Sequence, residues 1–298
     1  MKLLSMLVLT AACATALAQD YGDTPYVQTP QNVVDRMLEV AKVRADDFVI
    51  DLGSGDGRMI ITAAKKYGAR GFGVDLDRRL VTLSNRLAAK SGVAERAVFY
   101  ERDIYQTDLS PASVVTIYLL PEVNLMMRPR LFNMLKPGTR VVSHDYDMGE
   151  WPPDVAFTMD APDKPVGRDK TSKVFYWVVP AKASGKWRWQ TALDGNARTF
   201  ELVLNQMFQK IDGTLSVDGK PALIEDVRLT GDQLSFAVRL EQARYEFNGR
   251  IFMNGVEGTV RAQRDGATPQ RWAATRTEIW EPRHFALPAP TLLPPQPQ

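Results

Sequence analysis

The chain has 298 residues, of which 45% are hydrophobic and 24% are charged, and its formal net charge is +2. This is the composition of an ordinary globular protein, long enough for two domains and a sizeable core. The small net charge argues against nucleic acid as a partner, because nucleic-acid-binding domains usually concentrate basic residues on one surface.

The first 18 residues contain the three parts of an export signal, in order. Lys2 provides a positive n-region, Leu3 to Leu9 form a short apolar segment, and Ala16 to Ala18 form a small-x-small cleavage site. We therefore expect residues 1–18 to be a signal peptide and the mature protein to be periplasmic. The alternatives are a lipid anchor on Cys13, the only cysteine, or a cytoplasmic protein whose signal is not used. After cleavage, no apolar run is long enough to span a membrane.

Strands and helices alternate in the next part of the chain. Thr29 is expected to cap a first helix that has Pro30 in its first turn. The predicted strands cover residues 47–53, 70–77, 97–103, 113–120 and 139–146, and the predicted helices between them cover residues 58–68, 78–92 and 121–138. This alternation is typical of a Rossmann-like, doubly wound parallel sheet. Strands at residues 155–159 and 173–180, with no helix between them, predict an antiparallel finish and seven strands in total.

Beyond Lys182, apolar and polar residues alternate over short runs separated by turn signals. The turn pairs are Asp212-Gly213, Asp218-Gly219, Gly231-Asp232, Asn248-Gly249, Asn254-Gly255 and Asp265-Gly266. About eight strands are expected, as in an antiparallel meander barrel or a sandwich. The predicted domains are thus an α/β domain at residues 19–181, an all-β domain at residues 182–282 and a Pro-rich tail at residues 283–298. Trp187, Trp189 and Trp272 are expected either to fill the all-β core or to line an aromatic ligand cavity.

The stretch VIDLGSGDGRMII, between the first strand and its helix, predicts a small-molecule site. Helix N-termini offer unpaired backbone N–H groups, and Gly53, Gly55 and Gly57 allow a ligand to approach the backbone closely. A nicotinamide site would have a glycine where Arg58 stands, and the Gly-Lys-Ser/Thr of a Walker loop is absent. Asp51 would repel a diphosphate, whereas it suits a ligand that carries an ammonium group.

The pattern D-x-G-x-G-x-G resembles motif I of the class I, seven-strand S-adenosylmethionine-dependent methyltransferases. The resemblance covers residues 30–180 and implies that the loop, Ser54 included, holds the methionine part of the cofactor, with the leading acid near its amino group. Asp75, at the end of the second strand, matches the acid that binds the ribose hydroxyls. Asp103 matches the acid near the adenine amino group, and Ile104 would pack on the ring. The alternative interpretation is a simple tight turn with solvated strand ends.

Two stretches, TPQNVVDRMLEVA and DLGSGDGR, more specifically resemble protein lysine methyltransferases. The similar groups are the family that modifies the ATP synthase c subunit and the seven-strand histone lysine methyltransferase, together with exported bacterial methyltransferase-domain proteins. The resemblance implies methyl transfer to a protein or small-molecule acceptor. It does not extend beyond Lys182, and recognition of the substrate by the all-β domain is a hypothesis of its own. No metal is expected, because no cluster of residues has metal-ligand spacing. The export signal supports an alternative, a non-catalytic cell-envelope protein that binds S-adenosylmethionine or S-adenosylhomocysteine, because the cofactor is made in the cytosol. The oligomeric state is left open.

The acceptor is expected above the carboxyl end of the fourth strand, where the sequence reads IYLLPEVN. Relatives that methylate bases or glutamine carry Asn/Asp-Pro-Pro-Tyr/Phe there, so this departure weakens those acceptors. Tyr118 either lines a methyl channel or packs in the core, while Glu122 and Asn124 either orient an amine or serve the start of the helix. His144, with Asp145 beside it, is either an acid/base candidate or a hydrogen-bonded residue at the sheet rim.

Overall fold

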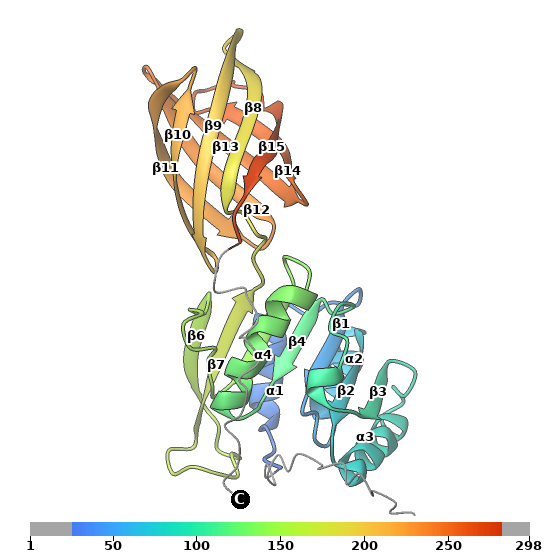
Figure 1. Ribbon diagram of the computed structural model, residues 1–298. Helices are drawn as coiled ribbons and strands as arrows, with labels where there is room; N and C mark the ends of the chain where they lie inside the picture. The colour runs from blue at the N-terminus through green and yellow to red at the C-terminus, as the bar shows by residue number, and fades with distance from the viewer. Residues whose placement is uncertain (1–25, 282–298) are drawn as a thin grey trace, which may run out of the picture.

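The computed structural model describes residues 26–281, which form a seven-stranded sheet with helices followed by a closed eight-stranded barrel (Figure 1). Both parts of the predicted fold class are confirmed, and the all-β part is a barrel and not a sandwich. The predicted signal peptide, Cys13 and the Pro-rich tail lie outside the described residues. No helix within residues 26–281 has the length and apolar character needed to cross a bilayer.

The sheet has the strand order β3-β2-β1-β4-β5-β7-β6. Its strands are β1 (Phe48–Leu52), β2 (Arg70–Asp75), β3 (Ala97–Glu101), β4 (Val114–Ile117), β5 (Arg140–His144), β6 (Val155–Asp160) and β7 (Thr171–Val178). The first five strands are parallel, whereas β7 is antiparallel to β5 and β6 is antiparallel to β7. All four residues of β4 are buried, as expected for a central strand that helices cover on both faces.

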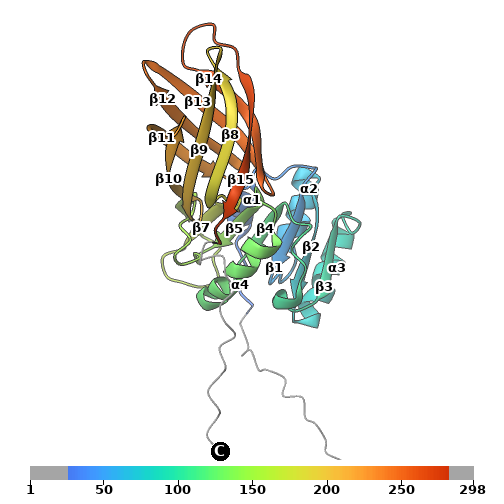
Figure 2. The same cartoon turned by 45° about the horizontal axis from the view of Figure 1, so that its top comes forward.

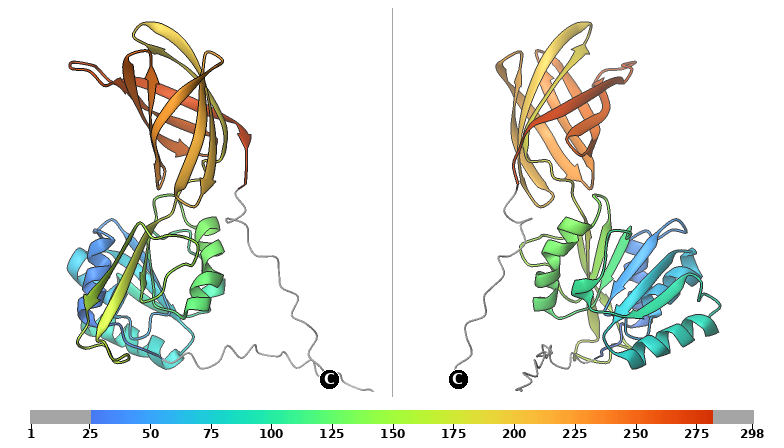
Figure 3. Two further views of the ribbon diagram at one scale, coloured as in Figure 1. Left: turned by 90° about the vertical axis from the view of Figure 1, so that its left-hand side faces the viewer. Right: turned by 45° about the vertical axis from the view of Figure 1, so that its right-hand side comes forward.

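Helices cover both faces of this sheet (Figure 3). One face carries α1 (Gln31–Val40), α2 (Arg58–Tyr67) and α3 (Arg78–Lys90), and the other carries α4 (Pro121–Met134) and the short 3₁₀ turn η1 (Ile104–Gln106). Gly68 ends α2 in the left-handed conformation. The side chain of Asp77 caps α3 by accepting a hydrogen bond from the backbone N–H of Arg79 at 2.8 Å. Local signals therefore set these helix ends.

The start of α1 differs from the prediction. Pro30 occupies the N-cap position, and no side chain caps the helix there. The hydroxyl group of Thr29 is instead hydrogen-bonded to Nδ1 of His144, at 3.2 Å. A long-range partner has thus taken the side chain that the local pattern assigned to the helix end.

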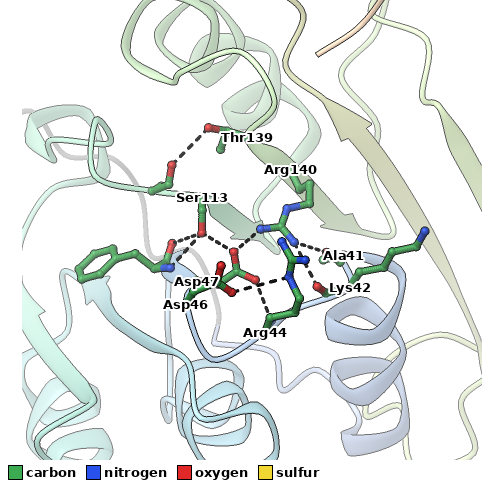
Figure 4. A network of polar contacts seen from close by, with 10 residues as sticks. Ala41, Lys42, Arg44, Asp46, Asp47, Ser113, Thr139 and Arg140 are labelled. Atoms are coloured by element: carbon green, nitrogen blue, oxygen red, sulfur yellow. Dashed lines mark hydrogen bonds and ion pairs between the residues drawn. The ribbon is translucent and has the colours of Figure 1, made fainter. Parts of the chain in front are cut away.

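A buried polar network joins the amino ends of the central strands (Figure 4). Asp47, just before β1, forms an ion pair with Arg140, the first residue of β5, and accepts hydrogen bonds from the hydroxyl of Ser113 and the backbone N–H of Arg44 at 2.7 Å each. Arg140 also donates to the backbone carbonyl of Ala41, the residue that follows α1. Burial raises the pKa of Asp47, but these hydrogen bonds outweigh it and the net shift is downward. The network therefore fixes the edge of the sheet that lies opposite the glycine loop.

The barrel consists of consecutive antiparallel strands that close when the last strand, β15, pairs with the first, β8. Its strands are β8 (Gly185–Leu193), β9 (Asn196–Met207), β10 (Lys210–Val217), β11 (Lys220–Thr230), β12 (Gln233–Leu240), β13 (Ala243–Phe252), β14 (Gly255–Ala262) and β15 (Gln270–Ile279). Trp189 stacks on Phe200 with ring centroids 4.8 Å apart, and Trp272 meets Phe247 edge to face. The three tryptophans are buried with other aromatic side chains, so they form the barrel core.

Two of the predicted turns lie inside strands. Asp212-Gly213 falls within β10 and Asn248-Gly249 within β13. A Cβ atom on Gly249 would lie 2.9 Å from the indole of Trp272, and one on Gly213 would overlap the carbonyl oxygen of Val203. These glycines therefore provide space between neighbouring strands, which is another common use of glycine in a sheet.

The barrel contacts the first domain at the amino ends of the parallel strands (Figures 1 and 2). Phe208, in the turn between β9 and β10, is 1% exposed and packs against Phe132 and Trp151, with ring centroids 5.6 Å and 6.4 Å away. The backbone N–H of Ala181 donates to the carbonyl of Gly231 at 2.8 Å. The barrel thus lies at the edge opposite the glycine loop, and this arrangement gives no support to a role for it in covering the candidate site.

Candidate active site

The glycine loop connects β1 to α2 in a conformation that requires glycine. Gly53, Gly55 and Gly57 have φ angles of 75°, 54° and 80°. A Cβ atom would lie 2.7 Å from the side chain of Leu119 at Gly53, and would overlap the ring of Tyr26 at Gly55. The loop is thus tightly enclosed, and its backbone N–H groups lie at the start of α2, where an anionic or polar ligand group is favoured.

Two carboxylates flank this loop. Asp51, in β1, is 7% exposed and accepts a hydrogen bond from the hydroxyl of Thr116 at 2.6 Å. Asp75, at the end of β2, accepts from the backbone N–H groups of Gly55 and Asp77 at 2.9 Å each. The pKa of Asp51 is raised to about 7, mainly by burial and also by the nearby charges of other acids, while the hydrogen bond from Thr116 acts in the opposite direction. The carboxyl group of Asp51 therefore gains from a cationic partner.

Asp103 and Ile104 lie beyond the end of β3, on the neighbouring part of the same edge. The side chain of Asp103 caps η1 by accepting a hydrogen bond from the backbone N–H of Tyr105 at 2.8 Å. Ile104 is partly buried against the hydrophobic cluster on the α4 face of the sheet. Because the carboxyl ends of parallel strands share one edge of a sheet, Asp51, Asp75 and Asp103 follow one another along it.

These features fit S-adenosylmethionine. The hydroxyl of Ser54 is buried and has no hydrogen-bond partner among the described residues, so it is available to a ligand in the loop. The buried acid Asp51 suits the amino group of the methionine part, and Asp75 offers a carboxylate that can accept from two hydroxyl groups. The residues present could therefore hold the cofactor in the way the sequence predicts.

A segment that the sequence analysis did not assign to the site also contacts the loop. Arg58 forms an ion pair with Asp56 at 2.6 Å and donates to the carbonyl of Thr29 at 2.7 Å. Gln28 donates to Asp56 at 3.3 Å, and the ring of Tyr26 covers Gly55. The chain before α1 is therefore fastened over the cofactor loop. The acidic and basic residues within DGR were the only sequence signal for this contact.

At the carboxyl ends of β4 and β5, Tyr118, His144 and Asp145 lie together. The rings of Tyr118 and His144 are 4.0 Å apart between centroids. The phenol group of Tyr118 donates to Asp145 at 3.4 Å, and burial together with this carboxylate raises the pKa of Tyr118. Lys164, from the loop between β6 and β7, forms an ion pair with Asp145 at 2.6 Å. This lysine lies in a Pro- and Asp-rich loop, and no local pattern distinguished it.

His144 is buried and hydrogen-bonded at both ring nitrogens. It is 0% exposed, and the partners of its ring nitrogens are the hydroxyl groups of Thr29 and Ser172. Burial lowers its pKa to about 4, although the charge of Asp145 acts in the opposite direction. The ring is therefore neutral near pH 7, and the alternative role at the sheet rim describes it better.

The two remaining candidates lie in the first turn of α4. Asn124 is 0% exposed, and its amide group donates to Ser143 and to the backbone carbonyls of Tyr146 and Asp147. It therefore holds the loop that follows β5. Glu122 is exposed in the first turn of α4, where a carboxylate favours the helix dipole.

Comparison with known proteins gives consistent results. The ANTKMT methyltransferase domain family matches residues 51–155. A protein-lysine N-methyltransferase of Saccharolobus islandicus is 48% identical over 130 residues, which cover 43% of this chain and 81% of the relative. The human lysine N-methyltransferase of the ATP synthase c subunit is 32% identical over 130 residues, which cover 44% of this chain and 55% of that protein.

Among solved structures, an RNA methyltransferase from Salinibacter ruber in complex with S-adenosylhomocysteine is 47% identical, with a TM-score of 0.46. The match covers 51% of this chain and 93% of that one. The family match lies wholly within the domain that carries the glycine loop and does not reach the barrel. The chain belongs to this methyltransferase family, and it is an S-adenosylmethionine-dependent methyltransferase.

Proposed function

We propose that this methyltransferase modifies the ε-amino group of a lysine in a protein. The observation that carries the proposal is the carboxylate of Asp145, which binds a lysine ammonium group between the ends of β4 and β7. A carboxylate in this position could recognise the ε-ammonium group of an incoming lysine. The relatives named as lysine methyltransferases support it, because one of them is aligned over 81% of its own length.

The residues of the glycine loop would hold the cofactor, with Asp51 at its amino group and Asp75 at its ribose. Bound there, S-adenosylmethionine supplies an activated methyl group on a sulfonium leaving group. The protein must then position the acceptor nitrogen in line with that methyl group and exclude water. The acceptor lysine would first have to lose its ammonium proton to water, because only the neutral amine has the lone pair that can accept a methyl group.

The test is transfer of radiolabelled methyl groups from S-adenosylmethionine to a cell-envelope extract, with the full chain as the enzyme. We expect label in protein, and we expect it to be recovered as methyl-lysine after acid hydrolysis. Asp75→Ala is the matched inactive variant. Label that ribonuclease removes would instead indicate an RNA acceptor and overturn the proposal.

A second candidate is a non-catalytic protein that binds S-adenosylmethionine or S-adenosylhomocysteine. It is favoured by the export-signal pattern of residues 1–18, because S-adenosylmethionine is made in the cytosol. If folded protein binds the cofactor in calorimetric titration but transfers no label to any extract, this candidate replaces the first.

We also propose that the protein is exported and that its acceptor is therefore a protein of the cell envelope. The proposal rests on the signal pattern of residues 1–18. Cell fractionation and amino-terminal sequencing test it: a periplasmic chain beginning at Gln19 is expected. A chain that keeps Met1 and remains with the cytosol would contradict it, and a lipid on Cys13 would indicate an anchored protein.

A further inference from the structure

The ion pair between Asp145 and Lys164 lies at the edge of the sheet where the acceptor must bind. Asp145 directly follows β5, and its neighbour across the edge, Tyr118, directly follows β4. Lys164 comes from residues 161–170, the loop between β6 and β7, and reaches back to place its Nζ 2.6 Å from Oδ2 of Asp145. Both side chains are mostly buried, at 12% and 14% exposed.

The carboxylate is held in place without the help of Lys164. Asp145 has a φ of 63°, the left-handed region that a residue other than glycine seldom adopts. One carboxylate oxygen accepts a hydrogen bond from the backbone N–H of Lys173, in β7, at 3.0 Å. The other accepts from the phenol of Tyr118 at 3.4 Å. Strands on both sides therefore orient this carboxylate, whereas Lys164 reaches it from a loop on a long, flexible side chain.

The groups around this carboxylate suit an alkylammonium ion. The ring of Tyr118 lies roughly parallel to that of Tyr146, with centroids 6.4 Å apart, and its hydroxyl group is hydrogen-bonded to the carboxylate. His144, 3.6 Å from the same carboxylate oxygen, is neutral because burial lowers its pKa to about 4. It therefore adds no positive charge that would compete for the carboxylate. The second contact of the lysine ammonium is the backbone carbonyl of Thr171, at 2.7 Å.

We propose that Asp145 is the binding site for the ε-ammonium group of the acceptor lysine, and that Lys164 occupies this position until the acceptor displaces it. The inference rests on the proposed lysine acceptor. Exchange of one ammonium ion for another leaves the buried carboxylate paired throughout, so it avoids the cost of an unpaired buried charge. An acceptor without a positive charge could not make this exchange, and the ion pair therefore selects for a cationic acceptor such as lysine.

The experiment measures binding of Nα-acetyl-lysine methylamide to the full chain saturated with S-adenosylhomocysteine, by calorimetric titration or NMR. Lys164→Met removes the internal competitor and should tighten binding about tenfold. Lys173→Met is the matched control, because it removes an exposed lysine from the adjacent strand and leaves the backbone contact intact. Asp145→Asn should abolish binding of the amine without weakening that of S-adenosylhomocysteine. The norleucine analogue, which lacks the amino group, should not bind more tightly to Lys164→Met.

The opposite substitution guards against a folding artefact. Lys164→Arg keeps the charge and holds a carboxylate more firmly through two parallel hydrogen bonds, so it should weaken binding of the lysine analogue. If the ion pair only fastens the loop, Lys164→Met will lower the unfolding temperature and leave amine binding unchanged or weaker, which overturns the inference. Because the readout is binding, absence of methyl transfer would contradict the proposed function alone. Methyl transfer to lysine with an unaltered KM in Lys164→Met would contradict this inference alone.

Discussion

At the scale of single residues, the candidate cofactor site depends on two acids with different surroundings. Asp75 is partly exposed and accepts hydrogen bonds from backbone N–H groups of the loop and of the turn after β2. Asp51 is buried beside Thr116. The same type of side chain is therefore oriented by backbone N–H groups at one position and has a raised pKa at the other, and the two positions lead to separate predictions.

Asp75→Ala should weaken binding of S-adenosylhomocysteine at least about tenfold, since a hydrogen bond to a charged group contributes roughly 1.5–3 kcal/mol. Calorimetric titration gives the Kd, and thermal unfolding shows whether the variant is folded. Asp77→Asn, on a residue close by, keeps a side chain able to cap α3 and should bind normally. Unchanged affinity in folded Asp75→Ala would show that the ribose is held elsewhere.

Binding of the cofactor should release a proton from Asp51. Its pKa of about 7 in the free protein means that many molecules carry a neutral Asp51 at pH 6.5. The cationic amino group of the cofactor favours the ionised form, so affinity should rise with pH between about 5.5 and 7 as the carboxylate ionises. Titration calorimetry in two buffers with different ionisation enthalpies measures the protons released.

The groups that face Asp51 are the hydroxyl of Thr116 and the carboxylates of Asp75 and Asp56, and none of them carries a positive charge. Asp51→Asn should therefore remove the proton release over this pH range. Equal heats in the two buffers for the unaltered chain would mean that Asp51 is already ionised before the cofactor binds.

The candidate cofactor residues stand out in the sequence because the glycine spacing and the acids at strand ends are local patterns. The partners of those residues could not. Thr29 is hydrogen-bonded to His144, 115 positions away in the chain, and Tyr26 reaches the loop from a segment without regular structure. Lys164 likewise meets Asp145 only because β6 and β7 fold back beside β5. Such contacts depend on topology, which no short window of sequence contains.

At the scale of elements, the turn between β9 and β10 determines how the two domains meet. Gln209, beside Phe208, accepts a hydrogen bond from the indole of Trp151 at 3.1 Å and donates to the carbonyl of Pro152 at 2.7 Å. Aromatic packing and hydrogen bonding thus act on the same segment. The sequence predicts this turn at Asp212-Gly213, four residues after its position in the structure. An Asp-Gly pair is a stronger local turn signal than Phe208 with its neighbours.

Phe208→Ala should destabilise the protein by about 3–5 kcal/mol, the usual cost of removing a buried phenylalanine. The loss should appear as a lower midpoint of urea-induced unfolding. Met207→Ala is the matched control, because this neighbouring side chain is 57% exposed and its removal should change the midpoint little. Similar midpoints for both variants would show that the packing of the turn contributes little to stability.

At the scale of the whole molecule, the two domains differ in whether each builds its hydrophobic core from its own residues alone. Every barrel strand pairs with two others in a closed ring, and one aromatic core fills the interior. The first domain instead shares its α4-side core with Phe208 of the barrel. Strand periodicity and helix signals were enough to predict the folds of both domains. They did not predict the surface on which the two domains meet, because the sequence does not distinguish a buried aromatic residue from an exposed one.

Residues 182–281 alone should therefore fold into a stable barrel, whereas residues 26–181 alone should be less stable than in the full chain. Separate expression and thermal unfolding test this. The isolated first domain should also bind a hydrophobic dye at the surface around Phe132 and Trp151. A first domain that unfolds at the same temperature with and without the barrel would argue that the contact contributes nothing to its stability.

The closing of the barrel by its first and last strands has a consequence for how such a protein can change. Gly185 is paired with Ile279, so the barrel begins and ends at two points only about one strand spacing, ~4.8 Å, apart. The chain therefore enters and leaves the barrel at nearly the same place. The barrel could therefore be exchanged for another closed module with little change in the path of the chain, and the first domain would then lose only the packing that Phe208 provides.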